Sequence, residues 1–253
     1  MPRTIKLTIA YEGTGYVGWQ RQPNGRSIQG LLEDSFRRIE GAPVTIIGAG
    51  RTDAGVHALG QVASARITHA IEVTDLVRAL NAMLPTDIRV LEAIEMPNSF
   101  NVRKSVVGKV YRYRVVTGPF VSPFERRYAW HIEKPLDCLA MRDGGEAFLG
   151  EHDFAGFQAT GSEVKTSVRR ISRLDVNEVD LGRTAGGGRL VTIEVEGNGF
   201  LRYMVRTVVG TLVEVGTQQR VPADVAQVLA SRNRANAGPT APAEGLFLMR
   251  VNY

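Results

Sequence analysis

The order in which strand-like and helix-like patterns alternate over the first hundred residues constrains the fold most. Apolar and polar residues alternate from Ile5 to Ile9, as in a half-buried strand. A helical spacing begins after Ser27, the expected cap, and ends at Gly41. The other expected elements of this half are strands over 44–47, 61–67 and 88–94 and a helix over 74–84 capped by Thr74. This order is the split βαβ pattern, which predicts an α+β fold.

The second half of the chain has a similar outline. Residues 109–117 are expected to form a long strand with Tyr111 and Tyr113 on one face. Further expected elements are helices over 136–149, 200–215 and 223–229 and strands over 167–179, 190–196 and 246–251. Residues 182–188 hold four glycines and are expected to form a hairpin loop. We therefore expect two α+β halves, residues 1–105 and 106–253, with a cleft between them.

Composition narrows the class of protein. A length of 253 residues with 43% hydrophobic content is typical of a soluble globular protein. The single cysteine, Cys138, excludes an intrachain disulfide and a cysteine-rich zinc site and fits a reducing compartment. We expect no signal peptide and no membrane span, and therefore a cytoplasmic protein. The net charge of +5 favours a polyanionic partner, although only weakly.

The run from Ala49 to His57 carries the strongest sign of chemistry. Asp53 follows Arg51 and Thr52 and is flanked by small residues. An ionised aspartate is almost never fully buried without a partner, so this carboxylate is unlike ordinary core. The glycines of the run permit positive φ angles and a close approach by another surface. The ordinary alternative is an Asp-Ala-Gly turn beside a solvated arginine, and composition alone favours it.

Several motifs, this run included, resemble those of the TruA family of tRNA pseudouridine synthases. They follow the family's order from the first strand to the last, over residues 11–22, 27–33, 50–57, 81–88, 100–103, 109–113, 204–206 and 243–246. Several motifs in register are far more specific than one short motif. The resemblance implies the pseudouridine synthase fold, in which two pseudosymmetric ferredoxin-like halves share a mostly antiparallel sheet with a central cleft.

The resemblance also implies an activity, the isomerisation of uridine to pseudouridine in the tRNA anticodon stem-loop at the family's positions 38–40. The C–N glycosidic bond breaks and C1′ is joined to C5, so no redox step, external energy, cofactor or metal is expected. Asp53 is the implied catalytic carboxylate. Its attack on C1′, its attack on C6 and the start of an elimination all stay open. Each route needs an ionised Asp53, which a nearby cation favours.

Arg206 and Tyr111 complete the implied catalytic set. Arg206 is expected on a helix, in one stripe with Arg202 and Gly210, and the resemblance implies that it pairs with Asp53. For Arg202, a solvated surface charge is an equally good interpretation. Periodicity alone would make Tyr111 a core aromatic, whereas the resemblance implies that its ring stacks on the flipped uracil. Its hydroxyl could also help to remove the C5 proton.

Contacts to RNA are implied for a wider set of residues. Arg51 resembles a family residue that touches the RNA close to the reacting nucleotide. Two segments match others that touch tRNA, and their members here are Phe100, Asn101, Val102, Arg103, Lys104, Lys165 and Arg169. The four histidines have no metal-ligand spacing, so His57 is expected to be structural or to contact RNA. The resemblance further implies a homodimer that binds each tRNA across both subunits.

Two other functions stay open from the sequence. The chain could be a non-catalytic tRNA-binding protein, although such a protein is expected to have lost the catalytic carboxylate. Residues 48–52 could also form the phosphate loop of a nucleotide-using enzyme. They lack the Lys-Ser/Thr ending of a P-loop, and we expect a strand rather than a helix after them.

Overall fold

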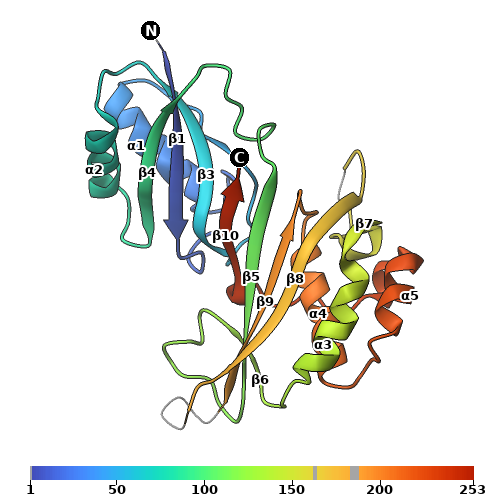
Figure 1. Ribbon diagram of the computed structural model, residues 1–253. Helices are drawn as coiled ribbons and strands as arrows, with labels where there is room; N and C mark the ends of the chain where they lie inside the picture. The colour runs from blue at the N-terminus through green and yellow to red at the C-terminus, as the bar shows by residue number, and fades with distance from the viewer. Residues whose placement is uncertain (1, 162–163, 183–187) are drawn as a thin grey trace. The chain divides into compact units, whose positions relative to one another are not determined.

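A computed structural model describes residues 2–161, 164–182 and 188–253 (Figure 1). The chain divides into unit 1, Met1–Val107 with Phe247–Tyr253, and unit 2, Gly108–Leu246. The division differs from the expected halves at the C-terminus, because the last strand pairs with unit 1 through Phe247 opposite His57. Most of the predicted glycine-rich loop, residues 183–187, lies outside the described residues.

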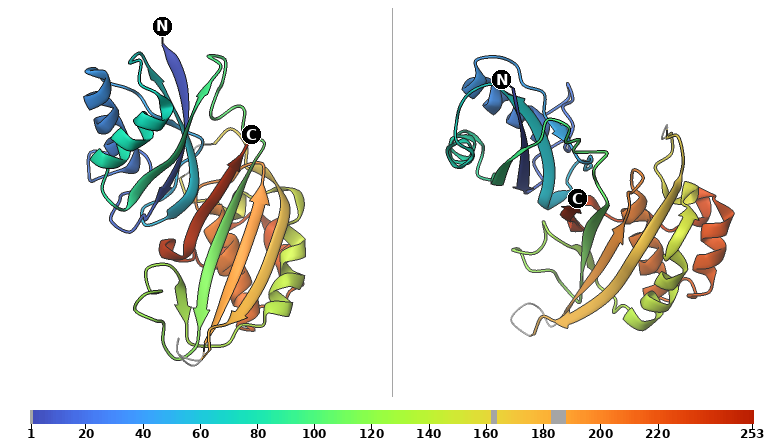
Figure 2. Two further views of the ribbon diagram at one scale, coloured as in Figure 1. Left: turned by 60° about the vertical axis from the view of Figure 1, so that its left-hand side comes forward. Right: turned by 45° about the horizontal axis from the view of Figure 1, so that its top comes forward.

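Unit 1 has the expected order of strands and helices. Its elements are β1 (Arg3–Tyr11), α1 (Ile28–Glu40), β2 (Ile47–Gly48), β3 (His57–Ile67), α2 (Val73–Met83) and β4 (Ile88–Met96), joined by β10 (Leu246–Asn252). The strands lie in the order β4-β1-β3-β10, and β2 also pairs with β3. β1 is antiparallel to both of its neighbours. Both helices cover one face of this sheet (Figures 1 and 2).

The ends of α1 lie where the sequence predicts them, but two nearby predictions are wrong. Ser27 Oγ accepts the Gly30 amide at 3.2 Å, and Gly41 ends the helix with a φ of 71°. α2 begins after Glu72, so Thr74 is not its cap. The strand expected over 44–47 is reduced to Ile47–Gly48. The backbone of Ile46 instead bonds to side chains of α1: its amide donates to Glu33, and Gln29 donates to its carbonyl.

Unit 2 repeats part of the connectivity of unit 1. Its main elements are β5 (Gly108–Thr117), β6 (Trp130–Ile132), α3 (Cys138–Gly145), β7 (Gly150–Asp153), β8 (Val168–Asp180), β9 (Arg189–Gly197), α4 (Met204–Gly216) and α5 (Asp224–Ser231). The strand order β5-β9-β8 in this unit corresponds to β1-β3-β2 in unit 1. The fold is thus α+β and mostly antiparallel, as expected. The helices of unit 2 lie on one side of its sheet (Figure 2).

The helix that carries Arg206 begins later than expected. Tyr203 has a φ of 67°, a left-handed conformation that no regular helix contains, so α4 starts at Met204. Arg202 therefore lies in the turn before the helix, and the stripe predicted for it with Arg206 does not exist. The helix packs into the core through Met204, Val208 and Leu212, which are all fully buried.

The sequence also overestimated one helix and missed two short strands. The helix expected over 136–149 is α3 followed by a single 3-10 turn, Glu146–Phe148. The missed strands, β6 and β7, have only three and four residues, too few for a periodic pattern to register. In the part of the chain that the structure describes, no helix is long and apolar enough to cross a membrane.

An aromatic cluster lies in the core of unit 2. Phe148, Phe154 and Phe157 are fully buried, with ring centroids 5.2 to 6.3 Å apart. Phe124, in contrast, lies on a loop of the same unit and is 86% exposed. The two environments offer a matched pair of substitutions.

Phe148→Ala should lower the free energy of unfolding by about 3–5 kcal/mol, because it leaves a cavity among packed rings. Phe124→Ala removes the same atoms from the surface and should change it by about 0.5 kcal/mol or less. Urea denaturation of both variants measures the difference. Similar losses in the two would show that the cluster is not a core.

Candidate active site

Asp53 lies on the connection between β2 and β3, and the neighbouring segment 11–19 holds this connection. The Trp19 amide donates to the Thr52 carbonyl at 3.0 Å. The Tyr11 hydroxyl lies 2.8 Å from Thr52 Oγ1, and burial raises the pKa of Tyr11 to about 12. Both contacts grip the residue immediately before Asp53. The backbone that presents the carboxylate is therefore fixed on its N-terminal side.

Two glycines let the segments approach this closely. Gly18 has a φ of +106°, and a Cβ there would lie 2.6 Å from the Thr52 carbonyl oxygen. A Cβ at Gly13 would lie 2.1 Å from the carbonyl oxygen of Val56. These approaches bracket the loop, since Thr52 precedes Asp53 and Val56 follows it. The sequence motif over 11–22 contains this signal, but its positioning role was not predicted.

His57 closes the loop from the other end and is structural. Its Nδ1 accepts the Gly13 amide at 3.0 Å, and its ring stacks on Phe247 with centroids 4.6 Å apart. The residue is 1% exposed, so its side chain is not available to a ligand. Of the two roles that the sequence left open, the structural one holds.

The loop leaves Asp53 half-buried and Arg51 exposed. The Val56 amide donates to the Asp53 carbonyl at 3.2 Å, and Gly55 has a φ of 79°. The ordinary interpretation, an Asp-Ala-Gly turn, is therefore also correct, because this turn is the device that presents Asp53. No helix follows residues 48–52, which exit through the turn into β3. The phosphate-loop hypothesis is therefore wrong.

The segment 100–104 braces the start of the same loop. Arg103 Nε donates to the Gly48 carbonyl at 3.1 Å. Val102 is 2% exposed and packs with Ala49 and Val62, against which Phe100 also packs. Its side chain is thus covered by the unit's own residues, and the contact of Val102 with RNA stays a prediction.

The rest of this segment faces outward. Asn101, Arg103 and Lys104 are exposed. Asn101 Oδ1 accepts the amides of both basic residues at 3.0 Å, which fixes the turn that carries them. The Tyr253 hydroxyl donates to the Val102 carbonyl at 2.8 Å. Tyr253 thereby also holds residues 100–104 against unit 1.

Tyr111 and Arg206 lie in unit 2, on β5 and α4, which pack against each other. Tyr111 is 8% exposed. Its ring and that of Phe200 make an edge-to-face contact, with centroids 5.2 Å apart. Arg206 lies in the first turn of α4, where its Nε donates to the Ala241 carbonyl at 2.6 Å. Its guanidinium carbon lies 4.9 Å from the ring centroid of Tyr203. A cation beside an aromatic face is held electrostatically as well as by contact.

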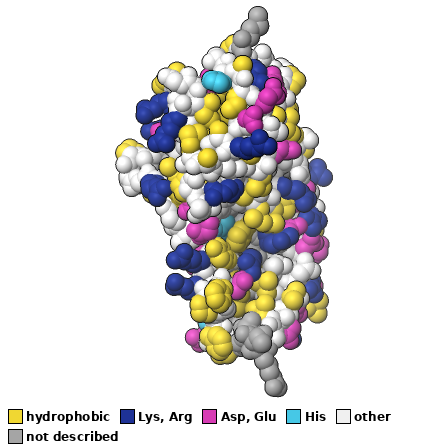
Figure 3. Space-filling model, turned by 90° about the vertical axis from the view of Figure 1, so that its left-hand side faces the viewer, with side chains coloured by type: hydrophobic (Ala, Val, Ile, Leu, Met, Phe, Trp, Pro, Cys, Tyr) yellow, Lys and Arg dark blue, Asp and Glu magenta, His cyan; other side chains and the backbone are white. Residues whose placement is uncertain are grey.

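Of the other predicted RNA contacts, Lys165 is exposed and Arg169 is half-buried. Arg169 Nη1 donates to the carbonyls of Thr166 and Val168, and burial lowers the pKa of its guanidinium. Figure 3 shows Lys and Arg side chains spread over one face among acidic ones, rather than gathered in a single patch. Within the described ranges, no group of three or more His, Cys, Asp or Glu residues could hold a metal ion.

Comparison with known proteins identifies the family. The family model described as tRNA pseudouridine synthase matches residues 7–103 and 146–253. The chain belongs to this family. A protein from Myxococcus xanthus named tRNA pseudouridine synthase A is 47% identical over all of this chain and 92% of its own length. One of the same name from Geobacter sulfurreducens is 43% identical over 99% of this chain and 100% of its own length.

Among solved structures, one titled "Crystal Structure of a Cbf5-Nop10-Gar1 Complex" matches with a TM-score of 0.35 at 14% identity. It covers 96% of this chain and 57% of that chain. This likeness is too distant to bear on the site.

Gly18→Ala should disturb the Asp53 loop, because a side chain there is strained at positive φ and collides with the Thr52 carbonyl. We expect a loss of about 1–3 kcal/mol in the free energy of unfolding and faster hydrogen exchange of the Trp19 amide. Gly15→Ala is the matched control, since a Cβ at Gly15 meets nothing within 4 Å. If Gly18→Ala and Gly15→Ala behave alike, the close approach of Gly18 to Thr52 does not hold the Asp53 loop.

Proposed function

We propose that this protein is a tRNA pseudouridine synthase in which Asp53 is the catalytic carboxylate. The observation that carries the proposal is the way unit 1 presents Asp53. Asp53 is half-buried. The backbone before it is held at Thr52 by Trp19 and Gly18, and the backbone after it is held at Val56 by the close approach of Gly13. Arg103 binds the Gly48 carbonyl at the start of the loop. Groups held in one geometry before the substrate arrives are what a positioned catalyst requires.

The proposed substrate is a uridine of the anticodon stem-loop, at the family's positions 38–40. The bond between C1′ and N1 breaks, the uracil turns, and C1′ becomes joined to C5. N1 then carries a proton, and C5 loses its own, so atoms balance without a co-reactant. Asp53 acts at the sugar or the base in its ionised form, and Arg206 is the proposed cation that favours this form. The choice between attack on C1′, attack on C6 and elimination is left to kinetics.

Tyr111 is the proposed platform for the flipped base. A uridine in a stem must leave the stack, at a cost of a few kcal/mol, before its C1′ and C5 can be reached. Stacking on an aromatic ring recovers about 1–3 kcal/mol of that cost. The T-shaped contact with Phe200 supports this role, because it fixes the plane of the Tyr111 ring.

The proposed RNA contacts are Arg51, Arg103, Lys104, Lys165 and Arg169, with Asn101 fixing the turn of two of them. Basic side chains on separate segments favour recognition of the backbone and shape of tRNA rather than of base edges. We further propose a homodimer that binds each tRNA across both subunits, and a cytoplasmic location. Sedimentation of the protein with and without tRNA tests the dimer.

Asp53→Asn should abolish pseudouridine formation, with a loss of about a thousandfold or more, because the amide keeps the shape but cannot act as a carboxylate. Affinity for tRNA should change little, since it comes from many phosphate contacts. Tritium release from C5-labelled uridine in a tRNA transcript measures turnover. Asp75→Asn, on the surface of α2 beside Arg78, is the control.

If Asp53→Asn turns over like the parent, Asp53 is not the catalyst. If the parent protein binds tRNA but releases no tritium, the chain is instead the non-catalytic tRNA-binding protein that the sequence left open.

Substitutions of Tyr111 separate its ring from its hydroxyl. Tyr111→Ala should lose the flipped state and turnover, because the stack is worth about 1–3 kcal/mol. Tyr111→Phe keeps the ring and should retain glycosidic cleavage. If the hydroxyl assists removal of the C5 proton, single-turnover kinetics with C5-deuterated uridine will show a larger isotope effect in Tyr111→Phe than in the parent. A Tyr111→Ala variant as fast as the parent would place another aromatic in the site.

A further inference from the structure

The side chain of Arg206 is bound to the backbone of a segment far along the chain. Its Nε donates to the Ala241 carbonyl at 2.6 Å, and the Ala241 amide donates to the Arg206 carbonyl at 3.1 Å. The bond fixes the direction of Nε–H, and the Tyr203 ring, whose centroid lies 4.9 Å from the guanidinium carbon, restricts rotation of the planar guanidinium about it. The position of Ala241 thus decides where the Arg206 charge points.

Ala241 belongs to residues 234–242, which we call the strap. The strap crosses α4 at backbone contact distance: a Cβ at Gly210 would lie 1.8 Å from the Pro239 carbonyl oxygen. A Cβ at Gly238 would lie 2.6 Å from the Thr211 amide nitrogen. The Gly238 amide donates to Thr211 Oγ1 at 3.0 Å, which ties the strap to the helix at this crossing.

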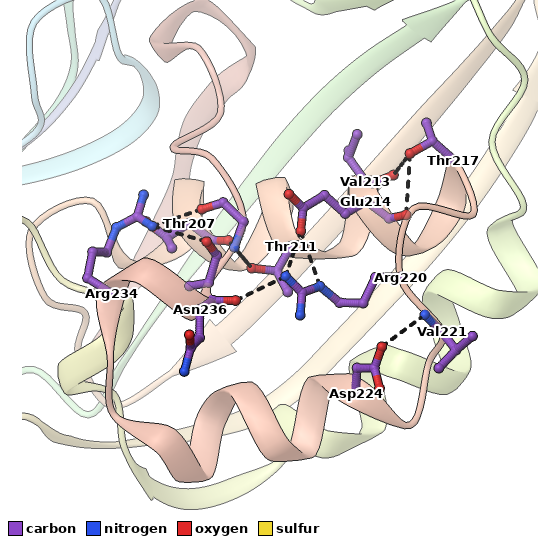
Figure 4. Close-up of polar contacts among 12 residues, drawn as sticks. Thr207, Thr211, Val213, Glu214, Thr217, Arg220, Val221, Asp224, Arg234 and Asn236 are labelled. Atoms are coloured by element: carbon purple, nitrogen blue, oxygen red, sulfur yellow. Dashed lines mark hydrogen bonds and ion pairs between the residues drawn. The ribbon is translucent and has the colours of Figure 1, made fainter.

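Arg234 organises the strap from within. Its Nη1 donates to the carbonyls of Ala237 and Gly238 at 3.3 and 3.0 Å, and its Nη2 donates to Thr240 Oγ1 at 3.0 Å. Figure 4 shows this guanidinium beside the turn of the strap. The fork of one arginine therefore gathers acceptors from three residues that lead directly to Ala241.

Two further contacts fix the ends of the strap. Arg220, which also pairs with Glu214, donates to the Asn236 carbonyl at 3.0 Å (Figure 4). At the other end the Tyr113 hydroxyl donates to the Pro242 carbonyl at 2.7 Å. Burial raises the pKa of Tyr113, so this hydroxyl stays protonated and able to donate. Ala241 lies between these anchored points.

The strap itself offers little apolar area. Residues 236–240 are Asn, Ala, Gly, Pro and Thr, and of these only the glycine is buried. Ala241 is fully buried, but residues 236–240 bury little apolar surface, so hydrogen bonds help to set the course of the strap. The bonds from Arg234 hold Ala237, Gly238 and Thr240 on the N-terminal side of Ala241, and the bond from Tyr113 holds Pro242 on its C-terminal side.

We propose that Arg234 is a positioning residue for Arg206. It shapes the strap, the strap places the Ala241 carbonyl, and this carbonyl aims the Arg206 guanidinium. Arg234 itself bonds to the strap rather than to Arg206. The inference rests on the proposed function for its effect on turnover, but the geometric link between Arg234 and Arg206 does not depend on it.

Arg234→Lys is the most informative test, because lysine keeps the charge but has no planar fork with which to gather three acceptors. We expect kcat for pseudouridine formation to fall about tenfold to a hundredfold, as for a misplaced catalytic group, with KM nearly unchanged. Arg232→Lys is the matched control: Arg232 is two residues away, exposed, and paired with Asp153 instead of the strap. It should keep the kcat of the parent.

A spectroscopic measurement reports on the same link without turnover. In protein labelled with nitrogen-15, the Nε–H signal of Arg206 is assigned from its disappearance in Arg206→Lys. Its hydrogen exchange should be slow in the parent and in Arg232→Lys, and faster in Arg234→Lys, because the bond to Ala241 is then loosened. Thr211→Val, which removes the acceptor of the Gly238 amide, should speed the exchange from the opposite side of the strap.

Several outcomes overturn the proposal. An unchanged kcat in Arg234→Lys would do so, as would a raised KM with an unchanged kcat, or an equal fall in Arg232→Lys. Unaltered exchange of the Arg206 Nε–H would also refute it. If Arg234→Lys does not fold, Thr211→Val decides. If the parent makes no pseudouridine, the proposed function fails, whereas the exchange measurement still tests the link.

Discussion

The approach of residues 11–19 to the Thr52 carbonyl is the constraint on which the presentation of Asp53 depends. The Trp19 amide can reach that oxygen only because Gly18 has no side chain and adopts a φ of +106°. A carboxylate proposed to act as a catalyst needs a fixed backbone, because a small displacement of a catalytic group lowers the rate strongly. Gly18 therefore acts on the placement of Asp53 through geometry alone, without a polar group of its own.

Unit 2 solves the same problem for a cation. Arg206 is held by a carbonyl of the strap, and the strap reaches α4 only because Gly210 and Gly238 leave their backbones uncovered. In both units a hydrogen bond to a backbone group positions a charged side chain, and a glycine allows the two segments to come close enough for it. Backbone groups suit this use, because they have no rotamers to lose.

The sequence predicted what periodicity encodes. Ile5, Leu7 and Ile9 alternate because β1 has one face in the core, and all three are fully buried. It failed where a side chain captured the backbone, as Glu33 and Gln29 do at Ile46, and where one residue left the helical region, as Tyr203 does before α4. Both events depend on partners distant in the sequence or on one backbone angle, which no window of apolar spacing contains.

The same limit applies to the candidate site. Asp53 was found because its neighbours form a continuous motif, and Arg206 and Tyr111 because short motifs surround them. Arg234 belongs to no motif that names it, since its three acceptors are carbonyls and a hydroxyl of its own segment. Carbonyls are present in every residue, so their use leaves no signature in the sequence. A positioning group that works through backbone acceptors becomes visible only when the fold brings the strap against α4, and its importance then follows from which oxygen it moves.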